Sequence, residues 1–202
     1  MKKKLFLGIM VAMLMLFGTA ESQASIATPD IGFDPAARNV VLGNPANVNL
    51  YFSQVTDIFT LGTFDLDISF DPTILSFSSV AFGDPILGDQ LDFGSGFGSI
   101  YAPTDFGGGL VNLFGLSTDL PEVLDANQAG SFILASLTFD TLSPGTSPLG
   151  LSVNALGDAM GDPLPADLVS GSINVTGVPE PATLLLLGSG LVGIGLIRRF
   201  CR

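Results

Sequence analysis

Almost all the side chains of this chain that could do acid–base or metal chemistry are aspartates. Its 202 residues include 19 Asp and Glu, 7 Lys and Arg, no His and one Cys. Without His, the chain has no Ser-His-Asp or Cys-His catalysis and no His-bound zinc. A single Cys excludes an intrachain disulfide and a thiolate metal cage. The net charge of −12 argues against a nucleic-acid partner, because phosphate backbones require a basic surface.

The acidic residues could in principle supply a pair for glycoside hydrolysis, which uses two carboxyl groups across a cleft. Between residues 25 and 177 there are 17 acids, and only Glu122 is a glutamate. Most of the aspartates fall in turns or on the polar side of predicted strands. Turn formation and solvent exposure explain them without catalysis. We therefore predict that the chain is not an enzyme, and keep a polysaccharide hydrolase as an alternative.

Two groups of loop aspartates have the oxygen chemistry that calcium prefers. Asp84, Asp89 and Asp92 lie in one long loop, and Asp158 and Asp162 lie near the C-terminal end of the domain. No Asp-x-Asp-x-Asp-Gly loop is present to specify a site. Two interpretations follow: a calcium site, or solvated carboxylates that keep an exported protein soluble. The sequence indicates no other cofactor.

Sugar binding on an aromatic surface would need exposed rings, usually Trp or Tyr. The chain has no Trp and only two tyrosines, Tyr51 and Tyr101. Most phenylalanines fall on apolar strand faces, where core packing explains them. Tyr101, in the Gly- and Asp-rich stretch 83–109, is the candidate ligand-contacting residue.

The elements that would position these residues are β-strands. Apolar and polar residues alternate over 48–52, 63–70, 133–140, 149–155 and 173–175, and more weakly over 75–82 and 110–116. This alternation is typical of antiparallel strands with one buried face. Frequent Gly and Pro exclude long helices, although Pro121–Gln128 predicts one or two helical turns capped by Asp119. The sequence therefore predicts one all-β sandwich domain over residues 25–177.

The N-terminus has the pattern of a secretory signal peptide. Lys2, Lys3 and Lys4 precede the uncharged apolar run 5–17. Small residues then lead to Ala24, after which we place cleavage by signal peptidase. Cleavage after Ala20 and an uncleaved N-terminal membrane helix are the alternatives. The predicted signal peptide is residues 1–24.

The C-terminus predicts a second membrane element. Residues 182–197 are uncharged and, as a helix, would be about 24 Å long, which is short but can span with local thinning. Arg198, Arg199 and Arg202 follow and would stop this helix on the cytoplasmic side. The domain between the two apolar runs is then carried across the membrane.

The sequence Pro179-Glu180-Pro181 directly before this helix, with the arginines at the end, resembles a PEP-CTERM sorting signal over residues 178–202. The resemblance implies processing by an exosortase in a Gram-negative bacterium, with cleavage near Pro179-Glu180-Pro181. Such proteins usually belong to bacteria that make extracellular polysaccharide. An ordinary tail anchor is the alternative.

The domain resembles the cohesin family. The resemblance rests on three segments: Leu61 to Leu75, with Asp71-Pro72 after a strand, the turn Pro144-Gly145-Thr146, and residues 162–175. The resemblance implies a jelly-roll β-sandwich of about nine strands, related in fold to carbohydrate-binding modules. True cohesins bind dockerins through one sheet face, but no dockerin-binding residues can be assigned here. An unrelated Greek-key sandwich is the alternative.

Together these observations predict an exported, non-enzymatic binding or adhesion module. An exosortase would process it after transient retention in the inner membrane and release it to the cell surface or the extracellular polysaccharide matrix. Its partner would be a polysaccharide or a surface protein. A passive structural matrix component without a discrete ligand is the alternative.

Overall fold

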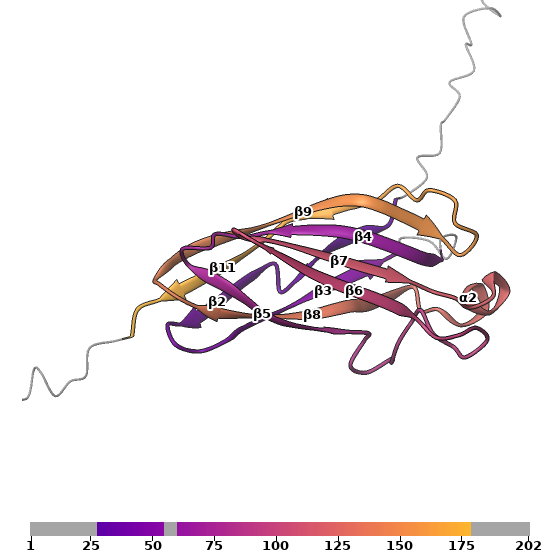
Figure 1. Cartoon of the computed structure of the whole chain (residues 1–202), viewed down its shortest axis with the longest axis horizontal. Helices are drawn as coiled ribbons and strands as arrows, with labels where there is room; N and C mark the ends of the chain where they lie inside the picture. Colours follow the sequence, from indigo (N-terminus) through magenta and orange to yellow (C-terminus); the bar gives the residue numbers. More distant parts are fainter. Residues whose placement is uncertain (1–27, 55–59, 179–202) are drawn as a thin grey trace, which may run out of the picture.

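A computed structural model describes residues 28–54 and 60–178, which fold into two β-sheets packed face to face (Figure 1). The predicted signal peptide and the segment 179–202, with its PEP motif, membrane helix and arginines, lie outside these residues. Within the two described ranges, no helix has the length and hydropathy to cross a membrane.

The first sheet has five strands in the order β10-β1-β3-β8-β5. Their bounds are β1 Asp30–Asp34, β3 Ala46–Ser53, β5 Leu75–Phe82, β8 Ser131–Thr141 and β10 Asp167–Val169. Only β1 and β10 pair in parallel; the other pairs are antiparallel. The alternating segment 133–140 is the middle of β8.

The second sheet has six strands in the order β2-β11-β9-β4-β7-β6. Their bounds are β2 Ala37–Val41, β4 Leu61–Ser69, β6 Ile100–Gly107, β7 Leu110–Leu116, β9 Gly145–Asp158 and β11 Gly171–Thr176. The strongest predicted strand, 63–70, is β4, which lies between β9 and β7. The two-sheet all-β sandwich predicted from the sequence is confirmed.

The described residues contain eleven strands, whereas the resemblance to cohesins implied about nine. The four that the sequence analysis did not identify are β1, β2, β6 and β10, although β1 has apolar residues at alternate positions, Ile31 and Phe33, which are buried. Of these, β2 and β10 are short edge strands, so neither needs a buried apolar face. β6 contains Pro103 and is also an edge strand, where a missing ladder N–H is tolerated.

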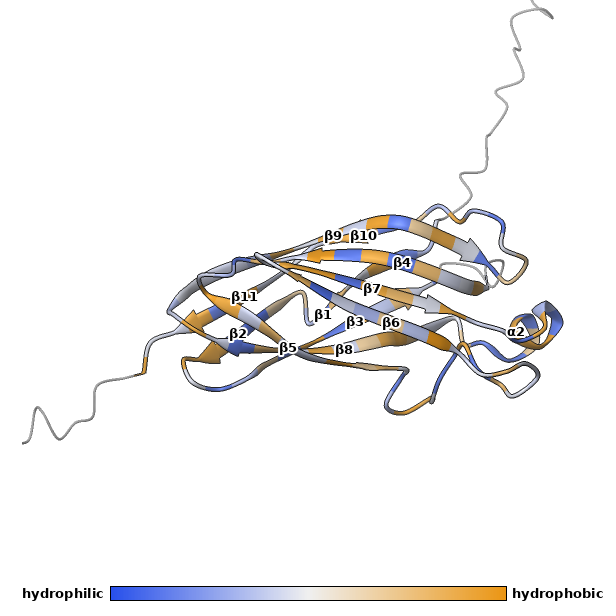
Figure 2. Cartoon of the chain, in the orientation of Figure 1, coloured by the Kyte–Doolittle hydropathy of each residue, from blue (hydrophilic) through white to orange (hydrophobic). Residues whose placement is uncertain are grey.

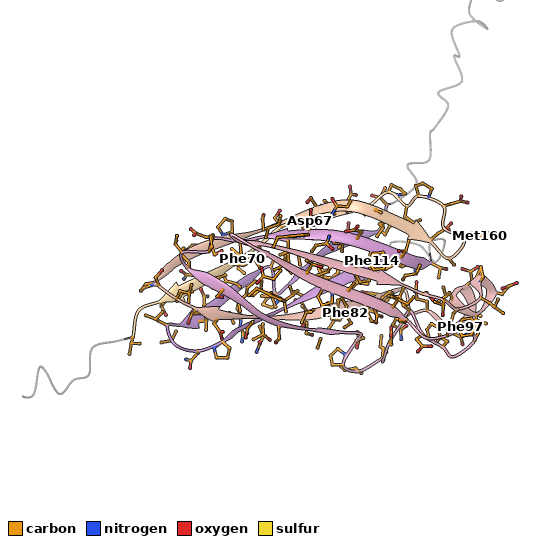
Figure 3. The ribbon with its side chains drawn as sticks, viewed as in Figure 1. Asp67, Phe70, Phe82, Phe97, Phe114 and Met160 are labelled. Carbon is orange, nitrogen blue, oxygen red and sulfur yellow. The ribbon has the colours of Figure 1, made fainter. Side chains whose placement is uncertain are left out.

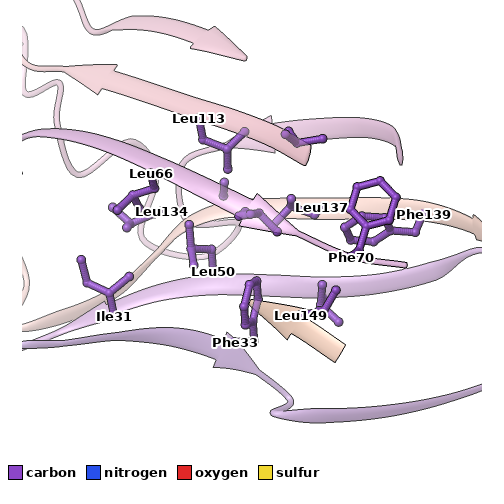
Figure 4. Close-up of a cluster of buried hydrophobic side chains, with 14 of the residues drawn as sticks. Ile31, Phe33, Leu50, Leu66, Phe70, Leu113, Leu134, Leu137, Phe139 and Leu149 are labelled. Atoms are coloured by element: carbon purple, nitrogen blue, oxygen red, sulfur yellow. The ribbon is translucent and has the colours of Figure 1, made fainter. Parts of the chain in front are cut away.

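The core fills the space between the sheets and consists of the inward side chains of the predicted alternation (Figure 4). Phe64, Leu66 and Ile68 of β4 are fully buried. Phe70 and Phe139 meet edge to face across the two sheets, with ring centroids 5.2 Å apart. Colouring by hydropathy shows the same alternation along the strands (Figure 2).

The helix α2, Pro121–Asn127, forms where the sequence predicted it, but Asp119 does not cap it. The N-cap is Leu120, which makes no side-chain cap bond, and Pro121 begins the helix. The Asp119 carboxylate instead accepts backbone N–H groups from the β5–β6 loop. The predicted cap was wrong because three donors from a distant loop compete for that carboxylate.

The sandwich is elongated, and α2 and the C-terminal end of β11 lie at its opposite ends (Figure 1). The end with α2 also carries the loops that contain Phe97 and Met160 (Figure 3). The last strand, β11, ends at the other end (Figure 1).

Candidate functional site

The outer side of β9, β4, β7 and β6 is an open surface, which we call the β4–β7 face. It is built by the strand register. Asp67 lies opposite Asn112 of β7 and Ser152 of β9, and Asp65 lies opposite Phe114. On β6, Thr104 and Ala102 extend the same two rows. Figure 3 shows Asp67 and Phe114 on the neighbouring strands.

A single amide group organises the two carboxylates of this face. Asn112 Nδ2 donates to Asp65 Oδ1 at 2.5 Å and to Asp67 Oδ1 at 2.8 Å. Asn154 of β9 adds a bond to Asp65 Oδ1 at 3.2 Å. The only Lys or Arg between residues 25 and 177 is Arg38, on β2 at the far edge of the sheet. Among the described residues, the two carboxylates therefore have no basic side chain beside them.

Apolar side chains lie beside this acidic centre, on β6 and β7. Ile100 is 51% exposed and Phe106 is 64% exposed. Phe114 and Leu116 are half-buried, and Leu116 lies opposite Ile100. The face thus combines fixed hydrogen-bond acceptors with apolar contact area, which is the mixture found in protein-binding surfaces.

The inner side of the same strands fixes the position of this face. Phe64, next to Asp65, is fully buried, and its ring lies over Gly115 of β7. A Cβ atom at Gly115 would lie 2.3 Å from that ring, so only glycine fits there. The face is therefore backed by a closely packed core rather than by a mobile loop.

The arrangement of Asp65 and Asp67 differs from that of a glycoside hydrolase pair. The two carboxylates are on one strand and share one amide donor, whereas glycoside hydrolysis needs carboxyl groups on either side of a scissile bond. The prediction that the chain is not an enzyme stays a prediction.

Among the predicted calcium ligands, the carboxylates of the long loop accept hydrogen bonds from their own loop. Asp84 accepts the N–H groups of Ile86, Leu87 and Ile133. Burial would raise the pKa of Asp84, but these bonds outweigh burial and hold that pKa below its usual range.

Asp89, Asp92 and Asp158 accept backbone N–H groups in the same way, whereas Asp162 takes part through its backbone N–H and not through its carboxylate. Asp89 accepts the N–H of Leu91, and Asp92 accepts the N–H of Gly94. Asp158 Oδ1 accepts the N–H groups of Met160 and Asp162 at 2.8 and 2.9 Å. Within residues 28–54 and 60–178, no three acidic, His or Cys side chains form a group that could hold a metal ion. The calcium hypothesis stays untested, and the geometry gives these carboxylates a loop-forming role.

The sequence analysis placed Tyr101 in a Gly- and Asp-rich loop, but in the structure it lies in the strand β6. It pairs with Gly115 in a row that points into the sandwich, and its ring stacks on Phe82 at 4.3 Å. Its hydroxyl donates to Asp89 Oδ1 at 2.6 Å. Burial and this bond raise the pKa of Tyr101. The structure therefore places Tyr101 against the core and away from the β4–β7 face.

The sequence did not single out Asn112, Asn154 or Phe114. The available signal was the alternation of β4, which already placed Asp65 and Asp67 on its polar side. The partners of these two residues depend on the register of β7 and β9, which sequence spacing alone does not determine.

Comparison with known proteins supplies two findings. The family model of the PEP-CTERM protein-sorting motif matches residues 177–199. A comparison with curated proteins found no match. The predicted sorting motif is confirmed, and the signal peptide and the domain boundaries stay predictions.

The second finding concerns the fold. The OlpC cohesin of Clostridium thermocellum, solved in complex with a dockerin, has a TM-score of 0.59 and 14% identity. The match covers 78% of this chain and 99% of that one. The fold is cohesin-like.

Two further cohesins give the same result. A non-cellulosomal cohesin from the archaeon Archaeoglobus fulgidus matches with a TM-score of 0.54 and 14% identity, over 78% of this chain and 96% of that one. A cohesin from Clostridium acetobutylicum matches with a TM-score of 0.55 and 19% identity, over 74% and 92%. At such identities the comparison establishes the cohesin-like fold alone.

Proposed function

We propose that this chain is an exported, non-enzymatic binding module that an exosortase releases to the cell surface or the extracellular polysaccharide matrix. The sorting motif at 177–199 supports export and exosortase processing. The cohesin-like fold supports a binding role, since the OlpC cohesin is solved with a dockerin bound. Signal peptidase and exosortase act during passage through the inner membrane, and the working partner is a protein.

The observation that carries this proposal is the pair Asp65 and Asp67 held by Asn112. A carboxylate that is already positioned loses little conformational entropy when it binds a Lys or Arg. Because Asn112 occupies one oxygen of each carboxylate, the remaining oxygens can accept a basic side chain. The neighbouring Ile100 and Phe114 supply apolar contact. We therefore infer a partner that presents basic and apolar side chains together.

Export is tested by the mass and location of the mature protein in its host, with and without the exosortase. The proposal requires a product that begins near Ser25, ends near Pro179-Glu180-Pro181 and lies outside the cell. A full-length C-terminus retained in the inner membrane of normal cells would contradict it. The protein would then be a tail-anchored domain.

Partner binding is tested by photo-crosslinking in that host, with a photoreactive phenylalanine at position 114. The matched control places it at position 81, which is exposed on the other sheet. We expect one discrete protein adduct at 114 and none at 81. The double variant Asp65→Asn, Asp67→Asn should abolish this adduct, whereas Asp140→Asn, on the opposite sheet, should preserve it.

The same experiment separates the alternatives. A passive matrix component would give no specific adduct at 114, or equal labelling at 81. A polysaccharide hydrolase would release reducing ends from soluble polysaccharides. The first result would overturn the proposed binding role of the β4–β7 face, and the release of reducing ends, measured in a separate assay, would overturn the non-enzymatic proposal.

A further inference from the structure

The five-stranded sheet, on the opposite side of the sandwich from the β4–β7 face, carries a cavity of about 500 Å³. It opens beside Tyr51 of β3. Its walls include Asp34, Ser131, Ile133 and Val169, from three other strands, and Asp84 from the loop after β5. The cavity is a hollow that is open to solvent, and its volume lies in the range of small-molecule sites.

The sequence makes this hollow by placing Gly32 next to Tyr51. The two residues are directly opposite each other in the β1–β3 register. A Cβ atom at Gly32 would lie 2.5 Å from Val169 Cβ and 3.0 Å from Tyr51 Oη. The tyrosine side chain therefore leans over Gly32, toward Val169 of β10, and glycine is needed for it to do so.

Three polar groups of the cavity are free to bind a ligand. Within the described part of the chain, the Asp34 carboxylate and the hydroxyls of Tyr51 and Ser131 make no side-chain hydrogen bond to the protein. By contrast, both oxygens of Asp84 already accept backbone N–H groups. Burial, together with Asp30 and Asp34, raises the pKa of Tyr51, so its hydroxyl stays protonated and can donate.

This combination points to a ligand that has several hydroxyl groups and an apolar face. A hexopyranose has both: its hydroxyls can donate to Asp34 and exchange bonds with Tyr51 and Ser131. Its C–H surface suits the apolar walls at Ile133 and Val169 and the aromatic ring of Tyr51. We propose that this cavity binds a neutral hexopyranose unit of a polysaccharide.

Charge restricts the ligand further. Two carboxylates, Asp34 and Asp84, line the cavity, and the only base between residues 25 and 177 is Arg38, on the other sheet. Acidic sugars would be repelled. An organic cation is less well matched than a neutral sugar, because only one carboxylate is free and the other partners are neutral hydroxyls. The proposal goes beyond the protein-binding role and does not depend on it.

The test is an NMR titration of the isotope-labelled, processed chain with cellobiose, maltose and lactose, and separately with digalacturonate and arginine amide. We expect at least one neutral disaccharide to shift the amide signals of Gly32 and Ser131, with millimolar affinity. Digalacturonate and arginine amide should leave those signals unchanged. The proposal is overturned if no neutral disaccharide shifts them, or if either charged probe shifts them as strongly.

Two tyrosine variants locate the effect. Tyr51→Phe keeps the ring and removes the hydroxyl, and should weaken sugar binding about three- to ten-fold, as expected for one lost hydrogen bond. Tyr101→Phe is the matched control, because it removes the other tyrosine hydroxyl on the opposite sheet, and should leave affinity unchanged. Equal effects of the two variants, or none from Tyr51→Phe, would contradict the assignment.

A third variant is a safeguard in case Tyr51→Phe disturbs the fold. Ser131→Ala changes an exposed side chain, so it keeps the assignment testable if Tyr51→Phe alters the amide spectrum as a whole. It should also weaken sugar binding several-fold, and unchanged affinity would contradict the role of its hydroxyl. Crosslinking at position 114 should persist in all three variants, so failure of the sugar site and failure of the partner face are separate outcomes.

Discussion

The Asp119 carboxylate is the best place to test whether these loops are held by side-chain acceptors. It is only 8% exposed. Its Oδ1 accepts the N–H groups of Ser95 and Gly96 at 2.9 and 2.7 Å, and its Oδ2 accepts that of Phe93. Asp119→Asn keeps the shape of the side chain but replaces one acceptor with an NH₂ group.

The expected cost follows from this count. Asn can satisfy two of the three donors, so one hydrogen bond to a charged acceptor is lost, and one N–H is left unsatisfied. Such a loss is about 2–3 kcal/mol. For a domain of this size, that corresponds to a fall in Tm of about 6–10 °C. The matched control is Asp140→Asn, which removes the same charge from an exposed position on β8.

The pH dependence gives a second readout. Burial alone would raise the pKa of Asp119, but the hydrogen bonds from Phe93, Ser95 and Gly96 outweigh it and hold that pKa below the usual range. A carboxyl whose pKa is lowered in the folded state stabilises that state above its unfolded pKa, about 3.9, and loses this effect as pH falls through the folded value. The difference between wild type and Asp119→Asn should therefore be full at neutral pH and shrink below about pH 4.

Calorimetry and urea unfolding at neutral and acidic pH measure both effects. Equal Tm values for Asp119→Asn and Asp140→Asn at neutral pH would refute the reasoning. So would a difference from wild type that persists unchanged in acid, since it could not then come from the carboxylate.

Three further predictions concern the core, the tyrosines and calcium. Leu66→Ala should lower the free energy of unfolding by about 2–5 kcal/mol, because Leu66 is fully buried; urea unfolding measures this, and an equal loss in Leu110→Ala, at a 37% exposed position, would contradict it. In a phenolate absorbance titration, both tyrosines should ionise at higher pH than in denatured protein, since the pKa values of Tyr51 and Tyr101 are raised. The neutral form of Tyr101 stabilises the fold below about pH 10, and this stabilisation is lost as pH rises further. Ionisation of Tyr101 near pH 10 in the native protein would contradict its burial. Millimolar calcium should leave Tm unchanged relative to EDTA, because the loop carboxylates already accept backbone N–H groups; a calorimetric rise would support the calcium hypothesis.

Alternation predicted most of the strands that bury one face, but not the five-residue β1, in which Ile31 and Phe33 are buried. β4 and β8 have apolar residues at every second position because the other sheet covers that side. β6 was not predicted because Pro103, Thr104 and Asp105 interrupt its alternation of apolar and polar residues. As an edge strand it pairs with one neighbouring strand only, so its sequence is less constrained. With β6 unassigned, Tyr101 was placed in a loop, although its register opposite Gly115 turns it inward.

The candidate surfaces were harder to predict because they depend on pairing between distant segments. Asp65 and Asn112 are far apart in the sequence and meet only through the β4–β7 register. The same is true of Gly32, Tyr51 and Val169, which three different strands bring together. Residue type indicated which side chains were polar, but only the sheet order indicated which of them share a face.

The position of the sorting motif bears on how both surfaces can be used. β11 lies between β2 and β9, inside the six-stranded sheet, and ends at Thr176, directly before the motif that starts at residue 177. β11 ends at the end of the sandwich opposite α2 (Figure 1). It lines neither the β4–β7 face, which β9, β4, β7 and β6 form, nor the cavity beside Tyr51. Since these sites are on opposite sheets, one domain can hold a protein partner and a sugar chain at the same time, and binding at one should leave the affinity of the other unchanged.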